Sequence, residues 1–420
     1  MSNKTTVPSL RFRGFSEPWE EKEFNEIFYY SIPNNTLSRA ELSYEDGSVY
    51  NVHYGDVLIK YGSILDIQCD KIPRIPNKNF SDFKGALLQD GDIIIADTAE
   101  DETVGKVCEI SNLQDSNVVS GLHTLAFRAN DKMALGYLGY YLNSEAYHRQ
   151  LLPLMQGIKV LSLSKSNIQK TIVRYSGSKN EQKQLADYFR NLDRLIALEQ
   201  RKYDKLNTVK KSMLEKMFPQ KGAKVPEIRF KGFSEPWEEK KLGDVGTITT
   251  GNTPSTSISG YYSEDGILWV TPTDIIENIT FQSTRKLSKL GQQVARVVPK
   301  HTILVTCIAS IGKNTMLGTN GCFNQQINGL TPDEDKYDSY FLLTESYLWS
   351  SQMKTFAASG TMQIVNKTEF SELKTLIPNL KEQQAIGSYF QNLDRLITSQ
   401  GRKIEKLRNL KKACLEKMFV

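Results

Sequence analysis

Residues Glu181–Phe218 read EQKQLADYFRNLDRLIALEQRKYDKLNTVKKSMLEKMF, and residues Glu382–Phe419 read EQQAIGSYFQNLDRLITSQGRKIEKLRNLKKACLEKMF. The two stretches align without a gap, each residue of the second standing 201 positions after its partner. Apolar residues mostly recur at spacings of three and four, as in Leu185, Phe189, Leu192 and Ile196. This spacing is typical of a coiled coil, and a helix of this length would extend ~55 Å. We therefore predict two long helices, over residues 181–220 and 382–420, that pack on each other.

The alternative is a pair of unrelated surface helices, each docked on its own domain. The two stretches also share charged residues, including the segments NLDRLI and LEKMF. A simple core-facing stripe would fix the apolar positions of a helix but not its charged ones. The shared charged positions therefore favour two copies of one duplicated element.

A second repeat precedes each long helix. Residues 7–22 read VPSLRFRGFSEPWEEK, and residues 225–240 read VPEIRFKGFSEPWEEK. We name these two segments the leading motifs. The chain is therefore a tandem duplication, in which each copy contains a leading motif, a variable body and a long helix. Short β-rich runs in the bodies predict α+β domains over residues 1–180 and 221–381.

A faint similarity between the bodies survives their divergence. The runs Gly91–Lys106 and His301–Lys313 each predict a buried strand, a polar loop and a Gly-Lys turn. We also expect one helical stretch in each body, over Leu135–Gln150 and Tyr337–Phe356. These shared elements indicate that the two bodies have a common fold.

Composition excludes several classes of protein. No apolar run is long enough for a membrane helix, and the first residues contain no apolar signal region, so we expect a cytoplasmic protein. The 5 cysteines are scattered and form no CxxC pair, which fits a reducing compartment. The net charge of +5 permits nucleic-acid binding without requiring it.

Catalytic and cofactor-binding patterns are missing from the sequence. Gly105-Lys106 and Gly312-Lys313 resemble the end of a phosphate-binding loop, but the earlier glycine and the following Ser or Thr are absent. The 4 histidines have no metal-ligand spacing, so we interpret them as loop or packing residues. No nucleophile elbow and no glycine-rich dinucleotide motif occurs. The sequence thus predicts a chain that is not itself an enzyme, holds no metal and binds no cofactor.

Polar loops are the remaining signal. The bodies carry Lys, Asn, Gln, Ser and Thr in loop-like stretches such as residues 71–84, 249–259 and 359–367. These side chains are the ones that contact base edges and phosphates in DNA. Any one such loop could simply be a solvated surface. Two similar modules joined by long helices, however, suit the recognition of two sites on one long ligand.

The paired leading motifs, the paired YF-x-NLDRLI helices and the stretch GILWVTPTDI resemble the specificity subunit of type I restriction–modification systems. The resemblance covers essentially the whole chain. It implies two target-recognition domains in tandem, each followed by a long helix, with the helices forming an antiparallel coiled coil of pseudo-twofold symmetry. It also implies that each domain recognises one half of a bipartite, asymmetric DNA site, and that the helices set the spacing between the halves.

The same resemblance implies the partners. These are double-stranded DNA, two methyltransferase (modification) subunits and the restriction subunits, which are translocase-nucleases. S-adenosylmethionine, ATP and Mg²⁺ would belong to those subunits, and no membrane is involved. We expect the leading motifs to contact partners through six aromatic residues: Phe12, Phe15, Trp19, Phe230, Phe233 and Trp237.

DNA contacts are expected on the body loops, from their position alone, because the recognition domains of the family vary too much to transfer contacts. In the first body we predict that they are Lys60, Arg74, Lys78, Lys159 and Lys165. In the second body we predict that they are Asn252, Thr253, Thr273, Lys313, Gln325, Gln363 and Lys367.

Two other functions are alternatives to DNA recognition. One is a non-catalytic coiled-coil scaffold joining two protein-binding or glycan-binding modules, and the other is a hydrolase or nuclease that acts alone.

Overall fold

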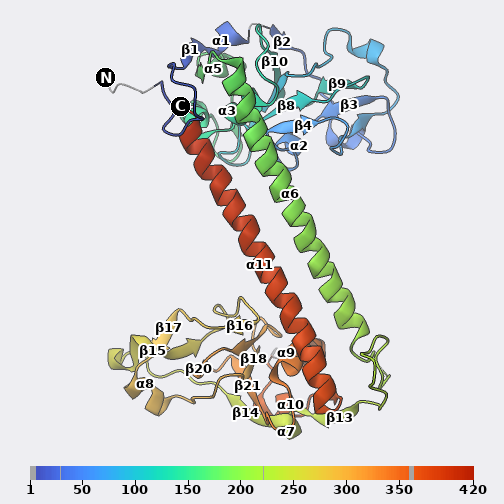
Figure 1. Cartoon of the computed structure of the whole chain (residues 1–420), viewed down its shortest axis with the longest axis vertical. Helices are drawn as coiled ribbons and strands as arrows, with labels where there is room; N and C mark the ends of the chain where they lie inside the picture. Colours follow the sequence, from blue (N-terminus) through green and yellow to red (C-terminus); the bar gives the residue numbers. More distant parts are fainter. Residues whose placement is uncertain (1–5, 29, 221, 359–363) are drawn as a thin grey trace. The chain divides into compact units, whose positions relative to one another are not determined.

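The computed structural model describes residues 6–28, 30–220, 222–358 and 364–420. The chain divides into two compact units (Figure 1). Unit 1 comprises residues 1–199 together with 403–420, and unit 2 comprises residues 200–402. The division therefore cuts across both long helices, so each unit contains a body together with one part of each helix. Within the described residues, no helix is long and apolar enough to cross a membrane.

Each unit contains a five-stranded mixed sheet, and the two sheets share one topology. In unit 1 the order is β2 (Tyr30–Ile32), β10 (Thr124–Arg128), β6 (Ile93–Ala96), β8 (Val107–Ser111), β4 (Ile64–Asp66). In unit 2 it is β14 (Gly246–Thr250), β21 (Ile327–Pro332), β18 (Ile303–Thr306), β19 (Asn314–Leu317), β16 (Ile279–Thr280). Both sheets are antiparallel except for the last pair, β4 with β8 and β16 with β19, which is parallel.

A three-stranded sheet accompanies each five-stranded sheet. The orders are β5 (Arg74–Ile75), β3 (Val49–Val52), β9 (Asn117–Ser120) in unit 1 and β17 (Arg285–Leu287), β15 (Tyr262–Val270), β20 (Gly321–Phe323) in unit 2. Two-stranded ribbons pair β1 (Glu20–Glu23) with β12 (Ile172–Tyr175), and β13 (Glu238–Lys241) with β22 (Lys374–Ile377). Unit 1 also pairs β7 (Thr98–Ala99) with β11 (Leu161–Ser162). The expected common α+β fold of the two bodies is therefore confirmed.

Short helices complete the bodies. They are α1 (Phe24–Ile27), α2 (Tyr54–Ile59), α4 (Glu145–His148) and α5 (Lys165–Ile168), then α7 (Leu242–Val245), α8 (Lys289–Val294) and α10 (Lys367–Ser371). In the described part of the chain, single-turn 3₁₀ segments cover Arg39–Glu41, Phe80–Phe83, Leu152–Leu154 and Ser259–Tyr261. The Gly-Lys turns lie directly before β8 and β19, as predicted, with φ of +90° at both Gly105 and Gly312.

The helical stretch of each body differs between the units. The second is one helix, α9 (Ser339–Ala358), close to the predicted range. The first was predicted as one helix over 135–150 but is two, α3 (Tyr137–Leu142) and α4. The break occurs because the Asn143 side chain bonds both the N–H and the C=O of Val107, at 3.0 and 2.7 Å. Ser144 then caps the new helix by accepting the N–H of Tyr147, and side chains of this kind compete with a continuous helix.

The long helices are α6 (Lys179–Lys216) and α11 (Leu380–Met418), each starting two residues before the predicted limit (Figure 1). Within unit 1, Lys411 Nζ lies 2.5 Å from Asp193 and Lys403 Nζ lies 3.0 Å from Glu199. Within unit 2, Lys210 Nζ lies 2.6 Å from Asp394. Phe218, beyond Lys210, lies beside Phe390, which precedes Asp394. In both units residue numbers therefore rise along one helix as they fall along the other, so the helices run antiparallel in each unit.

The phenylalanine just after each long helix lies in the core of a unit. In unit 1, Phe419 stacks on Phe189 with ring centres 5.6 Å apart, and its ring centre lies 6.0 Å from that of Trp19. In unit 2, the ring centre of Phe218 lies 6.0 Å from that of Phe390 and 5.7 Å from that of Trp237. Phe419 is the residue 201 positions after Phe218, so the two repeats build the same aromatic cluster. Burying side chains of this size is a dominant contribution to core stability.

Candidate nucleic-acid interface

One edge of the five-stranded sheet in unit 2 gathers several loops. Strand β14 ends at Thr250 opposite Asn328, and β18 ends at Thr306 opposite Ile327, so the loops after both strands begin at the same edge. Asn324 N donates to the carbonyl of Val270 at 3.0 Å, which brings the turn after β15 to this edge too. We name this region the unit 2 edge. Five predicted DNA contacts lie there: Asn252, Thr253, Thr273, Lys313 and Gln325.

Lys367 and Gln363 were predicted to join the same surface. Val365 N donates to the carbonyl of Cys307 at 3.0 Å, directly after β18. Lys367, two residues further on, is exposed at the start of α10, so the structure brings it to this edge. Gln363 lies outside the described residues.

Some side chains on the unit 2 edge hold the loops in place, and others expose hydrogen-bonding groups to solvent. Asn252 donates to the carbonyl of Val294 and accepts the N–H of Arg296, both at 2.9 Å, so its amide holds the loop in place. Thr253 Oγ1 donates to Gln325 Oε1 at 2.6 Å, and Gln325 is exposed. The hydroxyl therefore orients the amide and leaves its two N–H groups toward solvent.

The turn that carries Thr273 is built around a single carboxylate. Asp274 accepts the backbone N–H groups of Thr271 and Thr284, each at 2.8 Å. Burial raises the pKa of Asp274, but hydrogen bonds from Thr284 and Thr271 outweigh it and hold the pKa below its ordinary value. The turn is thus fixed by an ionised group, which presents Thr273 in a defined position.

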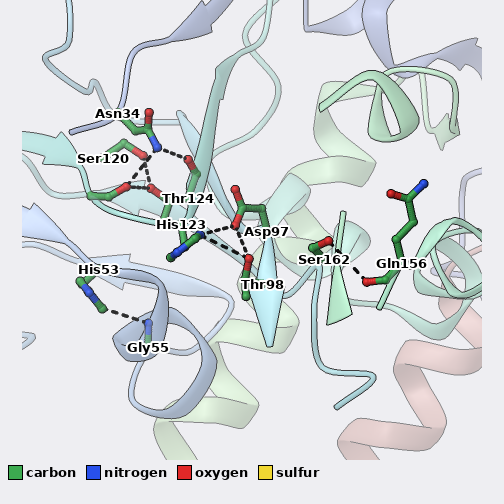
Figure 2. Close-up of polar contacts among 11 residues, drawn as sticks. Asn34, His53, Gly55, Asp97, Thr98, Ser120, His123, Thr124, Gln156 and Ser162 are labelled. Carbon is green, nitrogen blue, oxygen red and sulfur yellow. Dashed lines mark hydrogen bonds and ion pairs between the residues drawn. The ribbon is translucent and has the colours of Figure 1, made fainter. Parts of the chain in front are cut away.

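The matching edge of unit 1 carries different side chains (Figure 2). Asn34, after β2, donates to the carbonyl of Thr124 at 3.0 Å, and Ser120 and Thr124 share a hydroxyl hydrogen bond of 2.6 Å. Asp97, directly after β6, lies 3.4 Å from Nδ1 of His123. His123 has φ of +53°, a left-handed conformation that turns its half-exposed ring toward Asp97. We name this region the unit 1 edge.

His53 borders the unit 1 edge and serves the fold locally. It caps α2 by accepting the N–H of Gly55 at 3.3 Å (Figure 2). Burial lowers its pKa, although the nearby Asp56 carboxylate acts in the opposite direction. His53 is therefore neutral at neutral pH, which a capping acceptor requires.

The five predicted contacts of unit 1 occupy two places. Lys159 and Lys165 are exposed in the 156–165 segment, whose β11 pairs with β7 and whose Leu163 N–H donates to the Asp97 carbonyl at 2.8 Å. Lys60, Arg74 and Lys78 lie instead on or after α2 and β5. The Lys60 and Arg39 cations lie 5.2 and 5.0 Å from the ring centre of Tyr44, and Arg74 lies 4.9 Å from that of Tyr50.

Four residues of the unit 1 edge were missed by the sequence analysis: Asn34, Asp97, Thr98 and His123. The histidines were predicted to be loop or packing residues because they show no metal-ligand spacing, and His123 does lie in a turn. A usable signal did exist, because the strand–loop similarity between Gly91–Lys106 and His301–Lys313 places Asp97 and Thr98 immediately after a buried strand.

The leading motifs pack on the long helices of their own unit. Arg11 Nη2 lies 2.8 Å from the buried Glu181 carboxylate, and Arg229 Nη2 lies 2.7 Å from that of Glu382. Trp19 and Trp237 are buried at 3% and 1% exposure, and Phe12 and Phe230 pack edge-on against Tyr188 and Tyr389. Phe15 and Phe233 are half-buried. The two tryptophans therefore serve the internal packing of the chain, and partner contact by the six aromatic residues stays a prediction.

Across the described part of the chain, no three His, Cys, Asp or Glu side chains are grouped so that they could hold a metal ion. The two edges instead offer hydrogen-bonding groups, together with the Asp97 carboxylate in unit 1 and the Lys313 and Lys367 ammonium groups in unit 2. Amide, hydroxyl, imidazole and ammonium groups of this kind are what contacts to base edges and phosphates use.

A family model for the type I restriction modification DNA specificity domain matches the chain twice, over residues 16–208 and 234–409. The MjaX specificity subunit of Methanocaldococcus jannaschii, described as a type I restriction enzyme subunit, is 24% identical over 409 residues, which cover 94% of this chain and 91% of the relative. The HindI specificity subunit of Haemophilus influenzae, also of a type I restriction enzyme, is 31% identical over 147 residues, 34% of this chain and 32% of the relative.

Two solved structures share the fold. The S subunit of a type I restriction–modification system from M. genitalium matches with a TM-score of 0.60 and 14% identity, covering 99% of each chain. A chain from a structure on complex assembly and conformational transition of the type I R-M system matches with a TM-score of 0.54 and 17% identity, covering 96% of this chain and 99% of the other.

Proposed function

Because the chain belongs to the type I restriction modification DNA specificity family, we propose that it is the specificity subunit of such a system. Units 1 and 2 act as target-recognition domains, and each recognises one half of a bipartite, asymmetric DNA site. The unit 1 edge and the unit 2 edge are the surfaces that meet the bases.

One observation carries this proposal: the two units share strand order, while the matching edges carry different side chains. Unit 1 presents Asn34, Asp97 and His123, whereas unit 2 presents Thr253 and Gln325. A common scaffold with different polar edges is what two modules need if they bind the same polymer but select different bases.

The long helices are proposed to set the separation of the two half-sites. The Lys411–Asp193 pair of unit 1 and the Lys210–Asp394 pair of unit 2 join residues that the 201-residue repeat relates. Equivalent antiparallel contacts in both units support a spacer of fixed length. A flexible linker would not hold the two recognition domains at a fixed separation.

The partners follow from the same role. Two methyltransferase subunits and the restriction subunits assemble with this chain on double-stranded DNA in the cytoplasm. The chain is non-catalytic, and S-adenosylmethionine, ATP and Mg²⁺ are bound by the other subunits. The leading motifs and the long helices are the proposed docking surfaces for the methyltransferase.

The test is a map of methylated DNA from cells that carry this chain with its neighbouring methyltransferase, compared with cells that lack only this chain. We expect a split motif with two unequal halves and a fixed gap, which disappears without the chain. An unchanged map, together with no binding of the purified complex to random duplex DNA, would favour the scaffold alternative.

A further inference from the structure

Unit 2 contains a cavity of ≈ 660 Å³ beside the C-terminal end of α6. It lies between α9, the β13–β22 ribbon and residues 218–220. Its lining runs from the exposed Leu348 and Lys374 inward to the buried Trp349 and Glu345. The volume falls within the range of about 300–1,000 Å³ that is usual for binding pockets.

Glu345 at the inner end of the cavity has an unsatisfied oxygen. Its side chain is buried at 4% exposure, and Oε1 accepts the N–H of Leu376 at 3.1 Å. Oε2 is buried and has no hydrogen-bond partner. Burial raises the pKa of this carboxyl group, although the adjacent Thr375 side chain lowers it in part. A carboxyl oxygen that is removed from water without a donor is costly, so a binding partner that supplied one would gain substantially.

The charged groups near the mouth do not compensate this carboxyl group. Lys374 and Glu239, which both line the cavity, pair with each other at 2.7 Å. Gln352 donates to the Lys374 carbonyl at 2.9 Å and adds an amide oxygen to the lining. The cavity thus offers an uncompensated acid and further acceptors, between walls that include Phe218 and Trp349.

We propose that this cavity receives an arginine side chain of a protein subunit that docks on unit 2. A guanidinium group has five N–H donors for several acceptors, and its flat face packs well on aromatic rings. Anchoring pockets of this type, with Trp and Arg together, are frequent at the centre of protein interfaces. The proposal rests on the proposed function, which supplies the methyltransferase as the docking subunit.

The first unit has no buried acid at the equivalent place. There the strand N–H that corresponds to Leu376 belongs to Arg174, and it donates to the Tyr141 hydroxyl at 2.8 Å. Glu145, 200 positions before Glu345, is exposed and pairs with Arg149. The copy of the partner on unit 2 is therefore held by a charge-assisted contact that the copy on unit 1 lacks.

The experiment is a calorimetric titration of the purified chain with its methyltransferase subunit, for the wild type, Glu345→Gln and Glu145→Gln. We expect Glu345→Gln to weaken one of two sites by about 10- to 100-fold and to leave the other unchanged. Glu145→Gln is the matched control and should leave both sites unchanged. Thermal melts check that Glu345→Gln is folded, which its isosteric amide should permit.

A second readout separates a direct contact from a structural effect. Burial raises the pKa of Glu345 to about 8, so the acid is mostly protonated at pH 7. An arginine that pairs with it must displace the proton, and titrations at pH 7 in buffers of different ionisation enthalpy should show proton release. Glu345→Gln should release up to one proton fewer.

The outcomes are distinct. If the wild type binds no methyltransferase, the proposed function and this inference both fail. If two copies bind and Glu345→Gln weakens both sites equally, or neither, the function stands and the arginine pocket is wrong. Self-association of the chain that disappears in Glu345→Gln would assign the cavity to a second copy of this chain and would also overturn the proposal.

Discussion

The two units satisfy one strand hydrogen bond in different ways. In unit 1 the Arg174 N–H donates to the Tyr141 hydroxyl, and the helix breaks two residues later at Asn143. In unit 2 the residue after Tyr340 is Phe341, which has no hydroxyl, and Glu345 on the unbroken α9 accepts the Leu376 N–H instead. Tyr140 and Tyr340 fix the correspondence, because their hydroxyls donate to Asp193 and Asp394, each at 2.8 Å.

This difference shows what diverged bodies must still preserve. The sequences of α3 and α9 differ at Tyr141 and Phe341, yet each helix supplies an acceptor to the same strand position, because a buried N–H without a partner is costly. The acceptor can be a neutral hydroxyl or an acid. The choice decides whether this position carries a titratable group that a binding partner could pair with.

The largest expected effect tests what the units share. Trp19→Ala and Trp237→Ala each remove a buried tryptophan that contacts Phe419 or Phe218, and each should destabilise its unit by about 3–5 kcal/mol. Urea unfolding of both variants measures the loss. A loss below about 1 kcal/mol in only one of them would show that the two aromatic clusters are not equivalent.

A smaller effect, of a few kcal/mol, concerns pH. Burial raises the pKa of Glu345 to about 8 and that of Glu109 in unit 1 to about 7, although backbone N–H groups of Gly136 and Gly139 lower the latter. Below the unfolded-state pKa near 4.5, each acid is protonated in both the folded and the unfolded state, and its contribution to stability is fully present. That contribution is lost as pH rises toward the folded value, at up to ~1.4 kcal/mol per pH unit.

Unit 2 should therefore keep losing stability between pH 7 and 8, where unit 1 levels off. Melting curves of wild type and Glu345→Gln over pH 5–9 measure this. The variant should lack the loss above pH 7, and Glu145→Gln should behave as the wild type does. An identical pH profile in Glu345→Gln would contradict the assignment.

The next prediction tests the Tyr141 hydroxyl, which is the unit 1 counterpart of the Glu345 acceptor. Tyr141→Phe leaves the buried Arg174 N–H without an acceptor and should cost about 1–3 kcal/mol, with no change in the pH profile of unit 2. Denaturant titration measures the loss. Tyr140→Phe is the control, because its hydroxyl faces the partly exposed Asp193, and it should cost less.

The smallest effect concerns recognition. Thr253→Val removes the hydroxyl that orients Gln325, and should reduce discrimination at one base of the half-site recognised by unit 2 by about 0.5–1.5 kcal/mol. Methylation mapping with this variant should show a relaxed base at that position and an unchanged other half. Relaxation of both halves would mean that the units do not recognise their half-sites independently.

The sequence was most informative where the duplication left the chain similar. Helices α6 and α11 begin within two residues of their predicted starts, because apolar spacing and shared charges mark them together. The break in the first helical stretch could not be predicted, since it depends on Asn143 reaching Val107 in a distant strand. The adjacency of Asp97 and His123 was hidden for the same reason, because sheet pairing rather than spacing brings them together.

Phe419 lies in the core of unit 1, and this affects how the chain folds while the ribosome makes it. The first unit begins with the earliest residues of the chain but includes residues 403–420. A ribosome adds about 5–20 residues per second, so the cluster around Trp19 and Phe189 stays open for the time needed to translate unit 2. The nascent first body thus exposes an apolar surface that residues 403–420 cover only after they have been translated.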